Sequence, residues 1–116
     1  MKYVLFFCGT EEDVLRYEAM TEAERDAQLA RVGTWFADAR IESGRRLAPG
    51  STATTVRFPA EGDPLVTDGP FIEGKEDIGG WAVVDVSGLD EALAMARCWP
   101  ARGSVEVRPV HESDQG

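Results

Sequence analysis

The chain opens with a segment in which nearly every side chain is apolar. Residues 2–8 read KYVLFFC, and the residue types are those favoured in strands. If the segment is a strand, its two faces carry Tyr3, Leu5 and Phe7, and Val4, Phe6 and Cys8. Apolar residues on both faces are typical of a sheet that is covered on both sides. We therefore predict a strand at residues 2–8 in such a sheet.

Two threonines mark helix starts. Thr10 precedes three acidic residues and can cap a short helical turn, and Thr21 with Glu24 has the spacing of a capping box. The apolar stripe that follows recurs at helical spacing and consists of Leu29, Val32, Trp35, Phe36 and Ala39. We predict a helix over residues 21–43, ended by Gly44 as a left-handed C-terminal residue.

The rest of the chain divides into strands, turns and one more helix. Residues 45–49 and 52–58 are expected to form either a strand pair or a strand with an irregular approach. Residues 65–69 are expected to form a short extended piece, 78–86 a strong strand and 104–110 the last strand. A second helix is expected over 90–99, with Ser87 or Gly88 as its cap. Gly79-Gly80 before Trp81 indicates a bulge or a close backbone approach.

This order of elements predicts one architecture. Strand, helix, strand, strand, helix, strand is the α+β, ferredoxin-like βαββαβ arrangement, here in a single domain at 1–110 followed by a C-terminal tail at 111–116. Such a sheet carries its helices on one face. Because both faces of the first strand are apolar, we predict that a second copy covers the other face and that the protein is a homodimer.

Composition and charge narrow the classes of function. The 116 residues are 43% apolar, which is ordinary for one globular domain, and 21 acidic against 12 basic residues give a net charge of −9. That charge disfavours nucleic acid and anionic membranes as partners. No signal-peptide pattern or membrane-length apolar run occurs, so we expect a cytoplasmic protein. Cys8 and Cys98 lack metal-binding spacing and no phosphate loop is present, so no cofactor is expected.

The sequence resembles the YCII-related domain family, in its branch marked by the tetrapeptide DGPF. The matching segments are MKYVLFFCG, TATTVRF, VTDGPFIEGKEDIGGWAVVDV, LDEALAMA and GSVEVRPV, in the family's order. The resemblance implies a ferredoxin-like fold that forms a dimeric α+β barrel. Most relatives have no assigned reaction, one dehalogenating enzyme for chlorinated aromatics shares the wider fold, and an association of some relatives with sigma factors hints at regulation.

One feature of the family is missing here. Classical members pair a helix histidine with an aspartate, suggested as a catalytic dyad. The comparable helix position, counted back from Gly44, is Gly33, and the only histidine of the chain is His111. The dyad is therefore absent in its usual form.

The DGPF segment supplies the first candidate site residues. Asp68 is either a general base or ligand acceptor at a strand end, or a turn residue that accepts backbone amides from Gly69 to Phe71. Gly69 and Pro70 shape the bend, and Phe71 is a core or interface plug or a stacking surface for a ligand. Lys75 is either the anion anchor of a pocket whose acid is Asp68, or one member of a solvated charge cluster.

Further candidates lie on the predicted sheet and helix. Arg57, Glu106 and Arg108 alternate with apolar residues and are expected on one polar sheet face, where the arginines can hold a carboxylate or form ordinary cross-strand pairs. Trp35 is a core aromatic or the wall of an apolar pocket. Cys8 is interpreted as a buried structural thiol.

Three functions remain open from the sequence. The first is binding of a small molecule beside the DGPF loop, with a regulatory role. The second is a cofactor-independent enzyme in which Asp68 is the acid or base and Lys75 or Arg108 holds an anionic group of a small polar or aromatic substrate. The third is a dimeric module that docks a partner.

Overall fold

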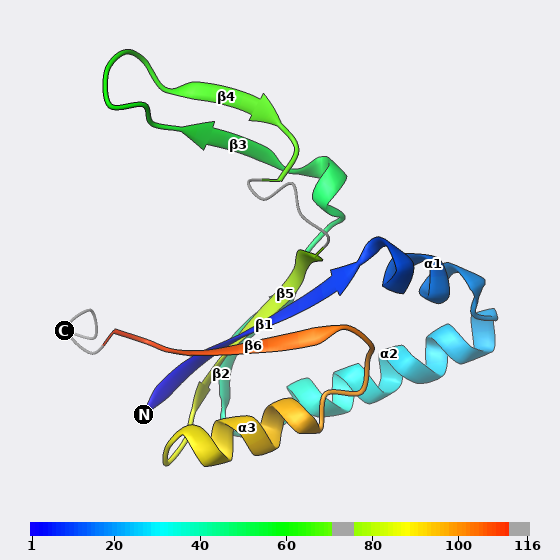
Figure 1. Cartoon of the computed structure of the whole chain (residues 1–116). Helices are drawn as coiled ribbons and strands as arrows, with labels where there is room; N and C mark the ends of the chain where they lie inside the picture. Colours follow the sequence, from blue (N-terminus) through cyan, green and yellow to red (C-terminus); the bar gives the residue numbers. More distant parts are fainter. Residues whose placement is uncertain (71–75, 112–116) are drawn as a thin grey trace.

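The structure is a computed structural model that describes residues 1–70 and 76–111. Figure 1 shows its elements in chain order. They are β1 (Lys2–Thr10), α1 (Glu11–Ala19), α2 (Glu22–Phe36), β2 (Ile41–Arg46), the 3-10 turn η1 (Gly50–Thr52), β3 (Thr54–Arg57), β4 (Leu65–Asp68), β5 (Glu76–Asp85), α3 (Leu89–Arg97) and β6 (Ser104–Pro109).

Four strands form one antiparallel sheet in the order β2-β5-β1-β6. Because β5 is antiparallel to both of its neighbours, β1 and β2 run parallel with β5 between them. By the same logic β5 and β6 run parallel on either side of β1. This split βαβ arrangement confirms the α+β class and is compatible with a ferredoxin-like fold.

The core lies between the sheet and the helices α2 and α3, which cover one face of it (Figure 1). Alternation along β1 and β5 buries every second side chain on that face, as a strand's period of two requires. The buried apolar residues come from the strands (Tyr3, Leu5, Phe7, Ala82, Val84), from Val86 directly after β5, and from the helices (Val32, Trp35, Ala92, Met95). The other set on β1, Val4, Phe6 and Cys8, lies on the face without helices and is half-buried.

Both predicted threonine caps are present. The Thr10 hydroxyl accepts from the Asp13 amide at 3.2 Å while the Asp13 carboxylate accepts from the Thr10 amide at 2.9 Å. Thr21 and Glu24 make the same reciprocal pair at 3.1 and 3.0 Å. These bonds satisfy helix-end amides that have no partner within the helix. The segment after Thr10 is a nine-residue helix rather than a single turn.

The predicted end of the second of these helices was wrong. Helix α2 stops at Phe36, and Gly44 lies inside β2. A Cβ at Gly44 would come within 2.8 Å of the Phe36 ring and of the Trp81 carbonyl oxygen. The glycine therefore permits close packing of a strand beneath the helix and does not terminate the helix.

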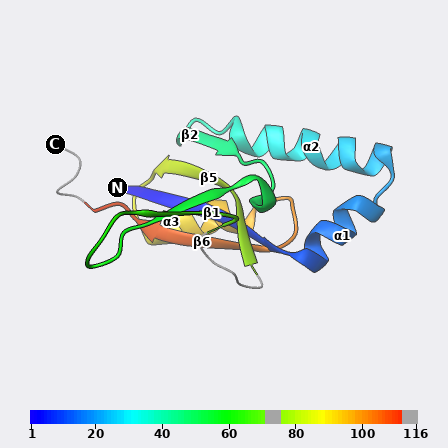
Figure 2. The same ribbon diagram turned by 90° about the horizontal axis from the view of Figure 1, so that it is seen from above.

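Of the two alternatives for residues 45–49 and 52–58, the strand pair was wrong, and a strand with an irregular approach agrees with β3 and the turn η1 before it. β2 pairs with β5 in the main sheet, whereas β3 pairs with β4 in a separate two-stranded hairpin. The hairpin projects on the side of the sheet opposite α2 and α3 (Figure 1), and it lies over the sheet when seen from above (Figure 2). We call residues 54–68 the arm.

The predicted bulge at Gly79-Gly80 is confirmed. Phe7 pairs with Gly80 and the next residue, Cys8, pairs with Ile78, so Gly79 is an extra residue on β5. A Cβ at Gly80 would lie 3.0 Å from the Arg45 carbonyl oxygen. The two glycines thus let β5 bend between its neighbours at the end of the sheet where it begins.

The turn between α2 and β2 yields a pH prediction. The Arg40 side chain donates to both carboxylate oxygens of Asp38, at 2.9 and 2.7 Å, and its amide donates at 2.9 Å. These bonds lower the pKa of Asp38 from 3.8 to about 2. Since the folded-state pKa lies below the ordinary value, the interaction stabilises the fold above that value and is lost as pH falls toward 2.

Carboxyl carbon NMR is expected to find the Asp38 titration midpoint near pH 2. Arg40→Gln should raise the midpoint toward 3.8. Arg97→Gln, which removes a cation from the end of α3, serves as the control and should leave it in place. An unchanged midpoint in Arg40→Gln would contradict the assignment of the shift to Arg40.

Candidate functional site

The DGPF segment begins at the base of the arm. Gly69 has φ of 102°, a conformation that favours glycine. Its amide donates to the Ala53 carbonyl at 2.8 Å, and its carbonyl accepts from the Thr55 hydroxyl at 2.7 Å. Pro70 follows, half-buried beside a hollow between the arm and the start of β5. The bend is therefore held by backbone bonds to β3 and its approach.

Asp68 is exposed at the last position of β4, opposite Thr54. The turn interpretation has it accept backbone amides from Gly69 to Phe71. The Gly69 amide is bonded to Ala53 and Pro70 has none, and Phe71 lies outside the described residues. Among the residues that the structure describes, the Asp68 carboxylate makes no hydrogen bond or ion pair. Phe71 and Lys75, the other candidates of this segment, lie outside the described residues.

The three charged residues expected on one sheet face are split between two sheets. Arg57 belongs to the arm, where its guanidinium donates to the Thr67 hydroxyl at 3.1 Å. Arg108 and Glu106 lie on β6 and form an ion pair at 2.7 Å. The expectation that Arg57 joins them is wrong within one protomer, because β3 pairs with β4 and not with the main sheet. Arg108 also lies 5.9 Å from the centre of the Phe6 ring.

Trp35 belongs to the core. Its indole N–H donates to the Met95 carbonyl at 2.9 Å, and its ring meets three others edge-on, at 5.3 Å from Phe7, 5.1 Å from Phe36 and 5.2 Å from Trp99. This confirms the interpretation of Trp35 as a core aromatic. Its outer edge borders shallow surface hollows beside Cys98.

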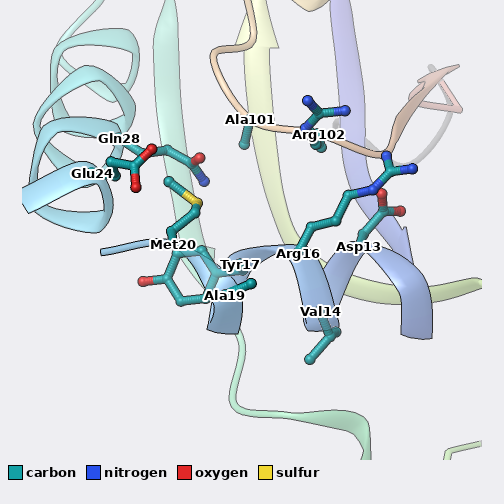
Figure 3. Close-up of a pocket in the computed structure, with 10 residues that line it drawn as sticks. All are labelled: Asp13, Val14, Arg16, Tyr17, Ala19, Met20, Glu24, Gln28, Ala101 and Arg102. Atoms are coloured by element: carbon teal, nitrogen blue, oxygen red, sulfur yellow. The ribbon is translucent and has the colours of Figure 1, made fainter. Parts of the chain in front are cut away.

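A groove that the sequence did not predict lies between α1, α2 and the connection from α3 to β6. It consists of an outer hollow of about 560 Å³ and an adjoining inner cavity of about 220 Å³, which share Tyr17, Gln28, Ala101 and Arg102. Figure 3 shows the outer hollow, with Glu24 and Gln28 of α2 on one side and Arg16 and Arg102 on the other. We call the two together the helical groove.

The inner cavity combines an aromatic wall with cationic groups. Phe7 and Trp99 stack with ring centres 3.8 Å apart and both line it. Polar lining side chains come from α1, α2, β2 and the α3–β6 connection, namely Tyr17, Gln28, Arg46 and Arg102. Gly9, Gly79 and Gly80 also line it, so it lies at the end of the sheet where β5 begins, directly after the DGPF segment.

The charged groups around the groove differ in whether they already have a partner within the chain. Backbone bonds to Thr10 and Thr21 lower the pKa of Asp13 and of Glu24, so both carboxylates are ionised and committed to helix caps. Arg16 pairs with Glu12 at 2.5 Å. Within the described part of the chain, the guanidinium groups of Arg46 and Arg102 have no hydrogen bond or ion pair. No carboxylate or histidine is found among the described residues that line the inner cavity.

Cys8 borders the inner cavity, although its side chain belongs to the set on the face without helices. Burial raises the pKa of its thiol, and the nearby carboxylates of Glu76, Glu106 and Asp77 raise it further. A raised pKa keeps the thiol protonated at neutral pH, which makes it a poor nucleophile. Within residues 1–70 and 76–111, no three metal-ligating side chains come close enough to hold an ion, and no helix is long and apolar enough to cross a membrane.

The groove residues were missed because they carry no local motif. Tyr17, Gln28, Arg46 and Arg102 are spread over four elements or connections, and each has the ordinary spacing of an exposed polar residue. The one signal in the sequence is Gly103 directly after Arg102, which marks a tight turn there. That signal locates a bend and says nothing of a cavity.

Comparison with known proteins gives the family. The sequence matches the YCII-related domain over residues 1–114. It is 38% identical over 109 residues to an uncharacterised protein of Rhizobium meliloti (strain 1021), with 89% of this chain and 87% of that protein covered. The chain therefore belongs to the YCII-related domain family.

Proposed function

We propose that the protein binds a small organic anion with a flat or apolar body in the inner cavity of the helical groove. The observation that supports this most directly is the pair of arginines, Arg46 and Arg102, that line a cavity without a carboxylate among its described residues. In a chain with net charge −9, two cations at a hollow whose described lining holds no carboxylate favour an anion there, although Asp13 of the outer hollow interacts with Arg102.

The chemistry of the cavity fits such a ligand. A guanidinium group matches a carboxylate or phosphate through two parallel hydrogen bonds. The Tyr17 hydroxyl and the Gln28 amide add hydrogen-bonding groups, and the Phe7–Trp99 stack offers an apolar wall. The volume of about 220 Å³ is below the range of about 300–1,000 Å³ for drug-sized ligands, so the ligand is a small metabolite.

Acid–base catalysis at Asp68 remains the alternative function. It predicts turnover of a small polar or aromatic substrate that Asp68→Ala abolishes. A general base needs to lie within hydrogen-bond reach of a bound substrate. Asp68 is exposed on the arm, so its position supports catalysis less well than the groove supports binding. Turnover of any ligand found below tests this alternative directly.

The test is a thermal-shift screen of small carboxylates and phosphates, aromatic and aliphatic, followed by calorimetric titration of the hits. Arg46→Gln and Arg102→Gln should each weaken binding about tenfold, because each removes one charge-assisted contact. A matched pair, Arg31→Gln and Arg97→Gln, removes equal charge outside the groove and should leave the affinity within about twofold.

Each other outcome has a definite meaning. A hit that Asp68→Ala abolishes and the groove variants do not would move the site to the DGPF segment. Equal losses of affinity in the groove variants and the control variants would show that the net charge of the protein, and not a contact in the groove, causes the effect. A screen in which no anion stabilises the wild type at millimolar concentration would contradict the proposed binding function.

We also propose that the protein works as a homodimer through the sheet face that bears no helices. Val4 and Phe6 of β1 lie beside Val83 and Trp81 of β5 on that face and are only half-buried. An apolar stripe across the middle of a sheet favours association with another apolar surface, which removes the stripe from water. Sedimentation equilibrium on the wild type tests the dimer.

A further inference from the structure

The arm lacks the contacts that normally stabilise a hairpin. Among the described residues its two strands, of four residues each, pair with each other and with no other strand. A two-stranded hairpin alone is at best marginally stable in water, and needs a further strand or a packed face. The radius of gyration is 16.3 Å, against about 13 Å for a compact chain of this length. The protomer is thus extended where the arm projects.

The two faces of the arm differ. Because directly paired residues share a face, Thr54, Val56, Val66 and Asp68 lie on one side and Thr55, Arg57, Leu65 and Thr67 on the other. Phe58, two residues after Val56, extends the first side. Phe58 is 79% exposed, Val66 66% and Val56 47%. The first side is therefore an apolar surface in water, which we call the apolar side of the arm.

The apolar side of the arm is continuous with the open face of the sheet. Leu47, Val56 and Ile78 line the hollow at the corner between them, and Ile78 pairs with Cys8 on the open face. From there the apolar surface continues over Phe6 and Trp81. The arm stands on the side of the sheet away from the helices (Figures 1 and 2), so the apolar side of the arm and the open face of the sheet meet at an angle. We call these two surfaces together the seat.

We infer that a second copy of this chain occupies the seat, so that the apolar side of each arm packs against the partner subunit. This inference rests on the homodimer proposed above and adds the arm to its interface. In a dimer with twofold symmetry, the partner subunit covers both the apolar side of the arm and the open face of the sheet, because each protomer supplies one of each. Val56, Phe58 and Val66 are the arm residues that the interface buries.

The sheet face offers a limited footprint to a partner subunit. Four strands about 4.8 Å apart, with about six residues rising about 3.3 Å each, span about 400 Å². A stable complex buries about 800 Å² on each partner. The arm is the apolar surface that adjoins this footprint and adds to the area available to a partner.

Several charges around the open face are already paired, although each copy carries −9. Arg108 pairs with Glu106 at 2.7 Å and Lys2 with Glu42 at 3.1 Å, whereas Arg45, opposite Trp81 on the same face, makes no ion pair among the described residues. The Met1 amino group likewise pairs with Asp85 at 3.2 Å. Of these charges, Arg45 is the one that a partner subunit has to accommodate.

The first experiment is sedimentation equilibrium on the wild type and two arm variants. The triple variant Val56→Ser, Phe58→Ser and Val66→Ser should raise the dimer dissociation constant about 100-fold or more, since three buried apolar side chains are lost. Leu65→Ser is the matched control. Leu65 is 57% exposed on the other side of the same hairpin, so its loss should change the constant less than about threefold.

The second experiment does not depend on substitutions. In a sample mixed from labelled and unlabelled chains, isotope-filtered NOE spectra should show contacts from the Val56 and Val66 methyl groups to the other protomer. A monomeric wild type would overturn the homodimer and this inference together. A dimer with no filtered contact from the arm, and with an unchanged dissociation constant in the triple variant, would overturn this inference alone. Neither result bears on anion binding in the helical groove.

Discussion

Replacing Gly103 by alanine is expected to destabilise the protein severely. The φ of Gly103 is 105°, and a Cβ there would come within 2.1 Å of the Cys8 carbonyl oxygen and 3.2 Å of its carbon. A left-handed backbone costs an ordinary residue about 1–2 kcal/mol, and overpacking adds about 1–3 kcal/mol. Because the clashing atoms are backbone atoms of β1, next to the start of β6, relief requires the two strands to separate.

Gly62→Ala is the matched control for this prediction. Gly62 also has a positive φ, 93°, but a Cβ there meets nothing within 4 Å. Urea denaturation at one protein concentration should show a loss of about 1–2 kcal/mol in the free energy of unfolding for Gly62→Ala, and a clearly larger loss for Gly103→Ala. Equal losses would contradict the role of the close approach to Cys8.

Truncation of Trp35 is expected to cause the second large loss of stability. Trp35→Ala removes a buried ring from contact with Phe7, Phe36 and Trp99 and should cost about 3–5 kcal/mol. Trp35→Phe keeps an aromatic ring and loses the bond to the Met95 carbonyl. That carbonyl still accepts from the Cys98 amide at 3.1 Å, so we expect a cost of only about 1 kcal/mol for the lost bond.

Differential scanning calorimetry at fixed protein concentration measures both variants. For a chain of this size each kcal/mol lowers the melting temperature by about 4 °C or more. Trp35→Phe should also leave anion affinity at the groove unchanged, because Trp35 is not among the described residues that line it. Weaker binding in Trp35→Phe with little loss of stability would instead support Trp35 as a ligand contact.

The elements that could be predicted are those whose chemistry is local. Each capping box needs one threonine and one acid three residues later, so the sequence contains the whole arrangement. The first and last strands, and the bulge at Gly79, likewise follow from residue types within a few positions. The antiparallel sheet and the α+β class then follow from the order of these elements.

The errors arose where distant residues decide a local conformation. The apolar stripe of α2 continues in the sequence to Ala39, but the Asp38–Arg40 turn ends the helix and β2 then pairs with β5. Gly44 was interpreted as a helix end because glycine often has that role, whereas here it accommodates Phe36 and the Trp81 carbonyl. Neither contact can be read from the neighbours of Gly44 in the chain.

The family, the fold class, the helix starts and three of the four strands of the sheet (β1, β5 and β6) could be predicted from the sequence, because they depend on periodicity and on side chains within one turn of each other. The separate arm, and the position of Arg46 and Arg102 at one cavity, became visible in the folded chain alone. The two arginines are more than fifty residues apart along the chain. Their proximity results from strand order and helix packing, which depend on the contacts of the whole chain and not on any local pattern.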